Sequence, residues 1–92
     1  MELKNKNVKI SELGEERTFV GGIKNWRIKW ATIFEEVFKV GDKVSYFDED
    51  NHETFIGVID WIIVTELGDI EVSISDTPLG RVDLESIEHV RE

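Results

Sequence analysis

Apolar and polar residues alternate most regularly over residues 70–74, where three branched apolar side chains are separated by polar ones. A period of two is typical of a strand with one buried face. Residues 76–80 hold Asp, Thr, Pro and Gly, which predicts a turn. The rest of the C-terminal part is predicted as a short strand at 81–84, a 3₁₀ turn at 85–88 and a last pairing at 89–90.

Residues 40–64 contain the longest β-rich stretch of the chain. A Gly41-Asp42 turn leads into a first strand around Val44 and Tyr46. A polar, acidic run follows at 48–53, and residues 54–64 are dense in branched and aromatic side chains, which favour strands. Gly57 lies inside this second strand, where a bulge or sharp bend is expected. The pattern predicts two strands joined by an acidic loop.

Residues 25–38 have apolar side chains at helical spacing, from Trp26 through to Phe38. Asn25 is an acceptable N-cap, and Gly41 lies just past the end. A strand is the alternative, because Trp26, Ile28 and Trp30 also alternate. We favour the helix because the stripe continues to Phe38, although basic residues early and acidic residues late oppose the helix dipole.

Earlier segments have weaker patterns. The first seven residues are predicted to fray, and one or two short strands are expected between Val8 and Val20. We expect five apolar residues, named below, to lie in the core. Replacing Trp30 or Phe34 by alanine should then lower the free energy of unfolding by roughly 3–5 kcal/mol. The predicted core residues are Trp30, Phe34, Val58, Ile74 and Val82.

Composition limits the class of protein. Ninety-two residues, 40% of them hydrophobic, fit one globular domain spanning residues 1–92. The absence of cysteine excludes disulfides and thiolate metal sites and is compatible with a reducing cytoplasm, where we expect the protein. No apolar run approaches the roughly 20 residues of a membrane span, and no signal segment is recognisable.

The net charge of −9 is unevenly distributed. Residues 1–40 hold eight basic and six acidic side chains, a balance of +2, whereas residues 41–92 hold three basic and fourteen acidic ones, a balance of −11. Such a field attracts cationic partners and repels nucleic acid, whose binding depends on Lys and Arg. Nucleic acid and membranes are therefore not the expected partners.

Two phrases resemble a known class of fold. Val40-Gly41-Asp42-Lys43-Val44, followed by residues 55–59, resembles the opening of SH3-like barrels of the KOW and Tudor type, and residues 80–87 are similar to their closing strand and 3₁₀ turn. The resemblance covers residues 39–91. It implies a mainly β (α+β) fold, a five-stranded SH3-like barrel preceded by residues 1–38 with a helix at about 25–38. It implies no single function, because such barrels perform many tasks.

Catalytic and metal-binding patterns are not found. His52 and His89 lie in a predicted loop and near the chain end, and no serine has the G-x-S-x-G context. Residues 48–53 alternate as calcium ligands would, but the positions that require Gly and Glu hold Glu53 and Ile59. We expect no enzyme activity, no metal site and no cofactor.

Binding chemistry is suggested by aromatic residues near the acidic run. Tyr46, Phe47, Phe55 and Trp61 could form an aromatic cage beside Asp48 and Asp50, or could simply pack in the core. A basic set at Lys24, Arg27 and Lys29, interleaved with Trp26 and Trp30, is either a nucleic-acid patch or a solvated helix face.

The sequence therefore favours a small, acidic, non-enzymatic module that binds a protein partner with a basic surface. One alternative is a phage or mobile-element inhibitor that mimics nucleic-acid charge, of the anti-CRISPR or anti-restriction type. A second alternative is an SH3-like barrel that binds RNA or DNA. The predicted contact residues are Tyr46, Asp48, Glu49, Asp50, Glu53 and Trp61.

Overall fold

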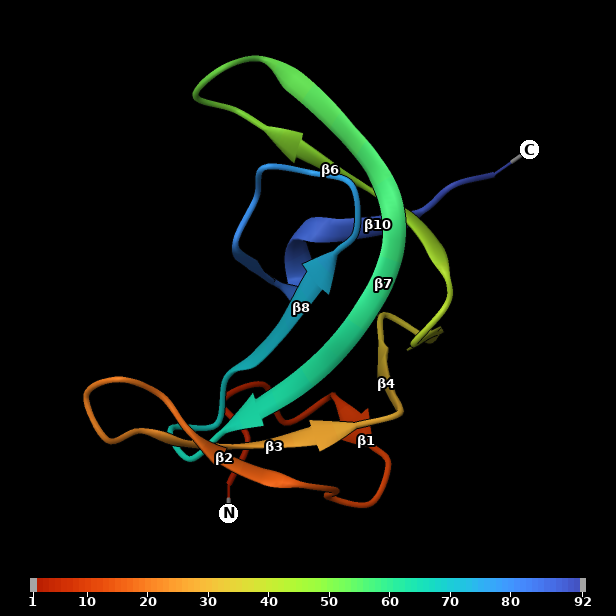
Figure 1. The fold of residues 1–92 in the computed structure, drawn as a ribbon. Coiled ribbons are helices and arrows are strands. Elements are labelled where there is room, and N and C mark those ends of the chain that lie inside the picture. Colours follow the sequence, from red (N-terminus) through yellow and green to blue (C-terminus); the bar gives the residue numbers. More distant parts are fainter. Residues whose placement is uncertain (1, 92) are drawn as a thin grey trace.

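The computed structural model describes residues 2–91 and consists almost entirely of β-strands and their connections (Figure 1). The elements are β1 (Lys9–Ile10), β2 (Glu16–Thr18), β3 (Lys24–Ile28), β4 (Trp30–Ile33), β5 (Glu36–Lys39), β6 (Lys43–Asp48), β7 (Glu53–Thr65), β8 (Ile70–Ile74), β9 (Arg81–Asp83), the 3₁₀ turn η1 (Leu84–Ser86) and β10 (Ile87–His89). Among the described residues, no helix is long and apolar enough to cross a membrane.

The strands form two open antiparallel sheets. One sheet has the order β1-β4-β5, and the other has the order β10-β6-β7-β3-β2, with β8 and β9 attached beside β7. β7 is the central element, because its first half pairs with β6 and its second half lies between β3 and β8. Figure 1 shows how strongly this long strand curves as it passes from one set of partners to the other.

The predicted fold class is wrong, since the structure is not a five-stranded barrel preceded by a helix. Residues 25–38 lie in β3, β4 and β5 instead. Phe34 and Glu35 have φ values of 52° and 63°, and Ile33 pairs with Glu36 across them. Positive φ at both central residues is the requirement of a type I′ hairpin turn, which no helix contains. The alternating pattern that begins at Trp26 was the correct signal.

The predicted hairpin at residues 40–64 is confirmed. β6 and β7 pair in register from Lys43–Val58 to Asp48–Glu53, and the acidic run connects them. The strand at 70–74 is confirmed as β8, and the predicted C-terminal elements lie within two residues of β9, η1 and β10. β8 was predictable from its alternation, and β6 and β7 were predictable because an acidic run separates two stretches rich in branched and aromatic residues.

Gly57 serves a purpose other than the expected bulge. The register shift of β7 against β8 lies further on, between Ile59 and Trp61. A Cβ on Gly57 would lie 2.2 Å from the carbonyl oxygen of Ser75 and 2.7 Å from Ile74 Cγ2. Only glycine allows the end of β8 to approach β7 this closely.

The core is formed by branched aliphatic side chains from both sheets together with Phe38, Leu84 and Ile87. Ile74 is buried as predicted, and Val82 packs against the core while half-buried. Trp30, Phe34 and Val58 are exposed by 37%, 75% and 39%, so their assignment to the core was wrong. Trp30 lies beside the buried Ala31 on β4 and therefore faces outward, and Phe34 occupies a turn.

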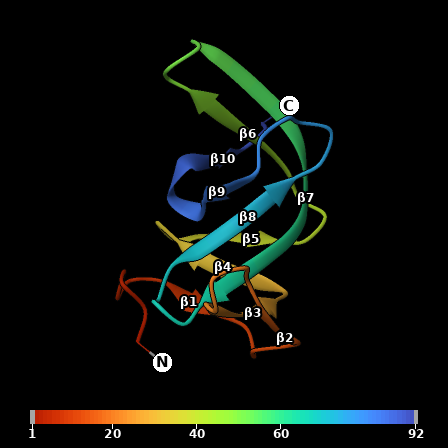
Figure 2. The same ribbon diagram turned by 60° about the vertical axis from the view of Figure 1, so that its left-hand side comes forward.

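The N-terminal segment is held in place rather than frayed over residues 2–7, and Met1 lies outside the described residues. Leu3 packs against the core, and Lys4 N donates to the Gly68 carbonyl at 3.1 Å. Lys4 Nζ also lies 3.0 Å from the Asp69 carboxylate. Figure 2 shows this segment beside the loop that joins β7 to β8. The prediction failed because charge and a terminal position carry no information about such long-range contacts.

Candidate functional site

Four carboxylates gather where the β6–β7 hairpin turns. Asp48 ends β6, Glu53 begins β7 directly opposite it, and Glu49 and Asp50 lie in the connection. We call Asp48, Glu49, Asp50 and Glu53 the acidic tip. Within residues 2–91, none of the four forms an ion pair with Lys or Arg. Figure 1 shows this end of the hairpin projecting beyond β8, so its negative charge faces solvent.

The tip has a fixed conformation because Asp48 organises it. Its carboxylate accepts a hydrogen bond from Asn51 Nδ2 at 2.8 Å and another from the backbone N–H of Asp50 at 3.0 Å. The hydrogen bond from the Asn51 side chain is the largest influence and lowers the pKa of Asp48. Desolvation, the next largest, opposes it, and the backbone N–H groups of Asn51 and Asp50 and the nearby His52 add to the lowering. Asp48 therefore stays ionised over an even wider pH range than an ordinary aspartate.

An apolar strip lies on the outer face of the same hairpin, whereas the cross-strand pair Asp48 and Glu53 points to the other face. Phe47, Ile56 and Val58 are exposed by 52%, 53% and 39%, and we call them the outer strip. Their cross-strand partners are Thr54, Ser45 and Lys43, which share the outward face. Residues 53–56 pair with β6 only, and no strand of residues 2–91 pairs with their opposite edge, whereas Gly57 lies against the end of β8.

Of the predicted contact residues, the structure groups all but one. Tyr46, Asp48, Glu49 and Asp50 line one shallow surface depression, and Glu53 lies opposite Asp48. Trp61 lies eight residues further along β7, up to about 26 Å away at 3.3 Å per residue.

The four aromatic residues do not form a cage. Tyr46 and Phe55 are cross-strand partners whose side chains are half-buried on the core side of the hairpin. Phe47 points to the opposite, outer face, and Trp61 lies at the other end of β7. The rings therefore cannot converge on one ligand, and for Tyr46 packing against the core is the correct reading.

A second polar surface lies at the distal half of β7. The guanidinium carbon of Arg27 lies 4.7 Å from the ring centroid of Trp61, and that of Arg81 lies 3.8 Å from the ring centroid of Phe19. Arg17 lines the same groove, whose volume is about 440 Å³. We call Arg17, Phe19, Arg27, Trp61 and Arg81 the arginine face. It contains three of the four arginines of the chain.

The basic set predicted from the sequence does not form. Lys24 and Arg27 are three positions apart on β3 and therefore point to opposite sides of the sheet. Arg17 and Arg81 were not predicted, because they reach Arg27 only through the pairing of β2 with β3 and of β9 with β8. The alternation of Arg27 with its neighbours, taken as a strand, was the one available signal.

Arg27 is the most unusual cation of the chain. Its Nε is buried and has no hydrogen-bond partner within residues 2–91. Desolvation by burial, and secondarily repulsion from Arg17, lowers the pKa of its guanidinium, while Glu15 opposes the shift. Arg17 has Glu15 at 3.1 Å and Arg81 has Glu71 at 3.7 Å, whereas Arg27 forms no ion pair with a carboxylate of residues 2–91.

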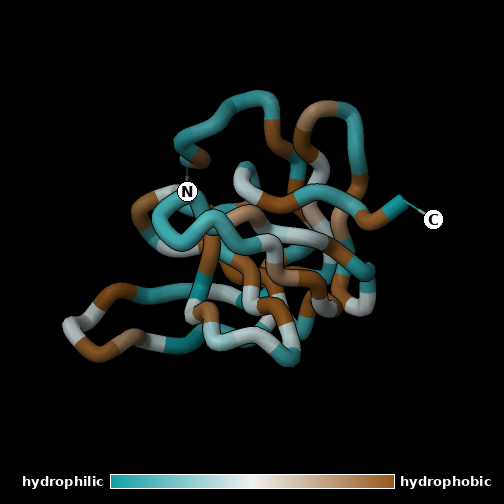
Figure 3. Tube along the Cα trace, turned by 90° about the horizontal axis from the view of Figure 1, so that it is seen from above, coloured by the Kyte–Doolittle hydropathy of each residue, from teal (hydrophilic) through white to brown (hydrophobic). Residues whose placement is uncertain are grey.

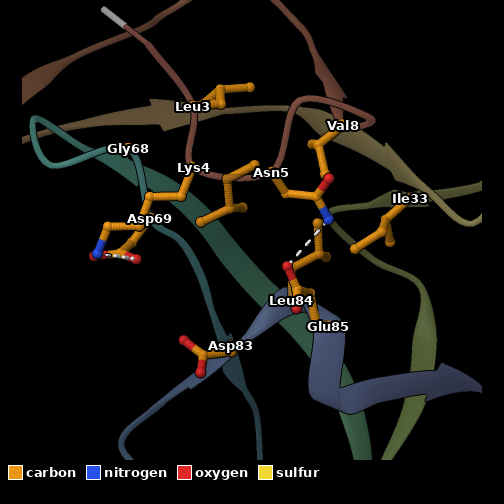
Figure 4. Close-up of a pocket in the computed structure, with 11 residues that line it drawn as sticks. Leu3, Lys4, Asn5, Val8, Ile33, Gly68, Asp69, Asp83, Leu84 and Glu85 are labelled. Atoms are coloured by element: carbon orange, nitrogen blue, oxygen red, sulfur yellow. Dashed lines mark hydrogen bonds and ion pairs between the residues drawn. The ribbon is translucent and has the colours of Figure 1, made fainter.

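Figure 4 shows the pocket between the N-terminal segment and η1, with a volume of about 250 Å³. Leu3, Val8, Ile33 and Leu84 form its apolar part. Its polar groups already bind one another, since Asn5 Nδ2 donates to Glu85 Oε1 at 3.2 Å and Lys4 pairs with Asp69. The pocket therefore lies where the N-terminal segment packs against η1 and the loop that joins β7 to β8.

In the part of the chain that the structure describes, no three His, Asp or Glu side chains are arranged to hold a metal ion. No protein-family model matches this chain, no curated protein matches it in sequence, and no solved structure matches it in fold.

Proposed function

We propose that this chain is a non-enzymatic interaction module that binds a basic protein partner through the β6–β7 hairpin. The observation that carries the proposal is the position of the acidic tip, whose carboxylates form no ion pair with Lys or Arg within residues 2–91, at the end of the hairpin that carries the exposed outer strip. An apolar patch rimmed by charge is typical of a protein-binding surface.

The two parts of this surface have different roles in binding. The acidic tip, with four negative charges on a chain of net charge −9, accelerates the encounter with a basic surface. Phe47, Ile56 and Val58 then lose water in the contact, and this burial supplies most of the affinity. The open edge at residues 53–56 offers backbone groups to which a partner strand can pair.

The outer strip favours this function over mimicry of nucleic acid. A protein that imitates phosphates needs rows of carboxylates and gains nothing from an exposed Phe47 or Ile56. Here the acids are concentrated at one hairpin end, and the same hairpin carries an apolar surface. We expect the partner to be a cytoplasmic protein, because the chain is free of cysteine.

The test compares three variants with the wild-type chain as baits in lysate, with quantitative mass spectrometry at low and moderate salt. The tip variant carries D48N, E49Q, D50N and E53Q, and the strip variant carries F47S and I56T. The control removes the same four charges elsewhere, at exposed Glu12, Glu16, Glu35 and Asp60.

We expect one basic protein to be captured by the wild-type and control baits, to be released by salt, and to be lost from the tip and strip variants. Equal loss with the control variant would show that only bulk charge matters. Unchanged capture by both hairpin variants would place the contact on another surface and contradict the proposal. Thermal melting of each bait establishes that it is folded.

A further inference from the structure

The arginine face lies on the side of the sheet opposite the core, and strand pairing assembles it from distant segments. Arg17 pairs with Asn25, Arg27 pairs with Ile63, and Ser73 lies between Trp61 and Arg81. Cross-strand partners point to the same side, so these side chains share one surface of β2, β3, β7, β8 and β9. Ile63 is buried there although it does not belong to the core cluster, because long side chains cover it.

A loop of unusual composition borders this surface. Phe19 and Val20 lead into Gly21 and Gly22, whose φ values of 107° and 90° need glycine. Val20 is fully exposed, and Phe19 and Val20 both line the groove. Figure 3 shows the β2–β3 loop projecting on the left, with hydrophobic segments on either side of its tip. The groove therefore has an apolar wall on one side and cations along its floor.

The cations on the floor are only partly neutralised. Arg17 and Arg81 each face one carboxylate, and Arg27 pairs with none within residues 2–91, so most of the fifteen or so N–H donors of three guanidiniums have no carboxylate opposite them. Arg17 and Arg27 also repel each other. An anion placed between Arg17 and Arg27 relieves this repulsion and accepts the fork-shaped pairs of donors that guanidinium presents to phosphate.

We propose that the arginine face is a binding site for a mononucleotide. The phosphate lies against the N–H edges of Arg17 and Arg27. The base stacks on the flat face of a guanidinium or on the ring of Trp61, since both kinds of plane accept bases. A groove of about 440 Å³ has the size of a small-ligand site.

The surroundings favour a single nucleotide over a longer strand. Glu15 and Glu71 flank the cations at the two sides of the face, and the chain carries a net charge of −9. Further phosphates would meet these carboxylates and lose more in repulsion than they gain. An acidic peptide is a poorer fit, because its carboxylates would bind the guanidinium N–H groups but it has no flat base to stack on the guanidinium or ring planes.

The experiment is an NMR titration of the ¹⁵N-labelled chain with AMP at millimolar concentrations. The signals to follow are the indole Nε1–H of Trp61 and the Nε–H of Arg27, with the indole of Trp30 on the other sheet as an internal reference. We expect saturable shifts of the first two signals only. Adenosine and inorganic phosphate, added separately, should each bind more weakly than AMP.

Variants make the assignment specific. Arg27→Gln should weaken AMP binding about tenfold or more, and Arg27→Lys should also weaken it, because the planar fork is lost while the charge remains. Lys9→Gln removes one exposed charge from β1 and should leave binding unchanged. The proposal is overturned by the absence of a saturable shift at Trp61, by equal weakening in Lys9→Gln, or by equal or tighter binding of octaglutamate or an eight-nucleotide strand. Melting curves verify that each variant is folded.

Discussion

The imidazole of His89 stacks on the ring of Phe38, with the ring centroids 4.2 Å apart and the planes 8° from parallel. Phe38 belongs to β5 and His89 to β10, so this contact joins the two sheets. His89 Nδ1 also lies 3.1 Å from Glu36 Oε2, and His89 Nε2 lies 3.0 Å from Asp42 Oδ2. No backbone pairing links β5 to β10, so side chains hold these two strands together. We call this contact between the sheets the seam.

Replacing His89 should therefore loosen the seam between the sheets. We expect His89→Ala to lower the free energy of unfolding by about 1–2 kcal/mol, since a stacked ring pair and polar contacts with two carboxylates are lost at a half-buried site. Arg91→Ala is the matched control: Arg91 also pairs with Glu36, but its side chain is 86% exposed, and the change should have little effect. Urea unfolding measures both. Equal stabilities of His89→Ala and the wild-type chain would show that the seam carries no stability.

The β4–β5 turn places two unsuitable residues in left-handed conformations. Phe34 and Glu35 have positive φ, which side chains with a Cβ disfavour, and Phe34 is 75% exposed. The double change Phe34→Asn with Glu35→Gly provides the preferred residues of a type I′ turn and should stabilise the chain by about 1 kcal/mol. Thermal or urea unfolding measures the difference.

The single change Phe34→Ala distinguishes the effect of turn strain on stability from the effect of side-chain burial. Alanine relieves none of the strain and removes little buried surface, so its effect should stay within about 0.5 kcal/mol. A loss of roughly 3–5 kcal/mol, as expected for a core phenylalanine, would contradict the exposed position. A double variant less stable than the wild-type chain would show that the present turn residues are favourable.

The helix predicted at residues 25–38 shows why sequence periodicity misled here. Buried residues of this segment are Ile28, Ala31, Ile33 and Phe38, besides the polar Asn25. The buried apolar side chains change from even-numbered to odd-numbered positions at Lys29, between β3 and β4. They change back in the turn at Phe34 and Glu35. Each interruption of a period of two produces an odd spacing, three from Ile28 to Ala31 and five from Ile33 to Phe38, and the apolar residues of the segment then imitate a helical stripe. Uninterrupted segments such as β8 were predicted correctly.

The candidate surfaces also differ in how much of each could be predicted from the sequence. The acidic tip was predictable, because a run of charges between two apolar strands has to lie in an exposed connection. Trp61 was placed in the wrong group, although the predicted strand at residues 54–64 already put it eight residues, or about 26 Å, beyond Glu53. The arginine face depends on the pairing of β2, β3, β7, β8 and β9, and Arg17 and Arg81 are 64 positions apart. Only the sheet brings them together.

The crossing of β7 and β8 at Gly57 predicts a strict requirement for glycine. In Gly57→Ala, the new methyl group would overlap the Ser75 carbonyl, a backbone atom that cannot rotate away. We expect a loss of about 2 kcal/mol or more. Gly80→Ala is the control, because a Cβ there meets nothing within 4 Å, and its effect should stay within about 0.5 kcal/mol. Equal stability of the two variants would mean that the crossing can relax at no cost.

The acidic tip should respond to pH through Asp48. Its pKa lies below the ordinary value of 3.8, chiefly because Asn51 donates to the charged form. A lowered pKa in the folded state means that the ionised carboxylate stabilises the turn above about pH 4, and that this contribution is lost as the pH falls through the folded-state pKa. Asp48 thus keeps its charge, and the turn keeps its conformation, throughout the range in which a basic partner would bind.

A ¹³C NMR titration of the side-chain carboxyl groups tests this directly. Asp48 should titrate below 3.8, and Asn51→Ala should move its midpoint upward, because the largest favourable contact is removed. A midpoint of Asp48 that Asn51→Ala leaves in place would show that the hydrogen bond does not hold the turn in solution. The acidic tip would then be a set of independent charges, and affinity for a basic partner would depend on their number rather than on their arrangement.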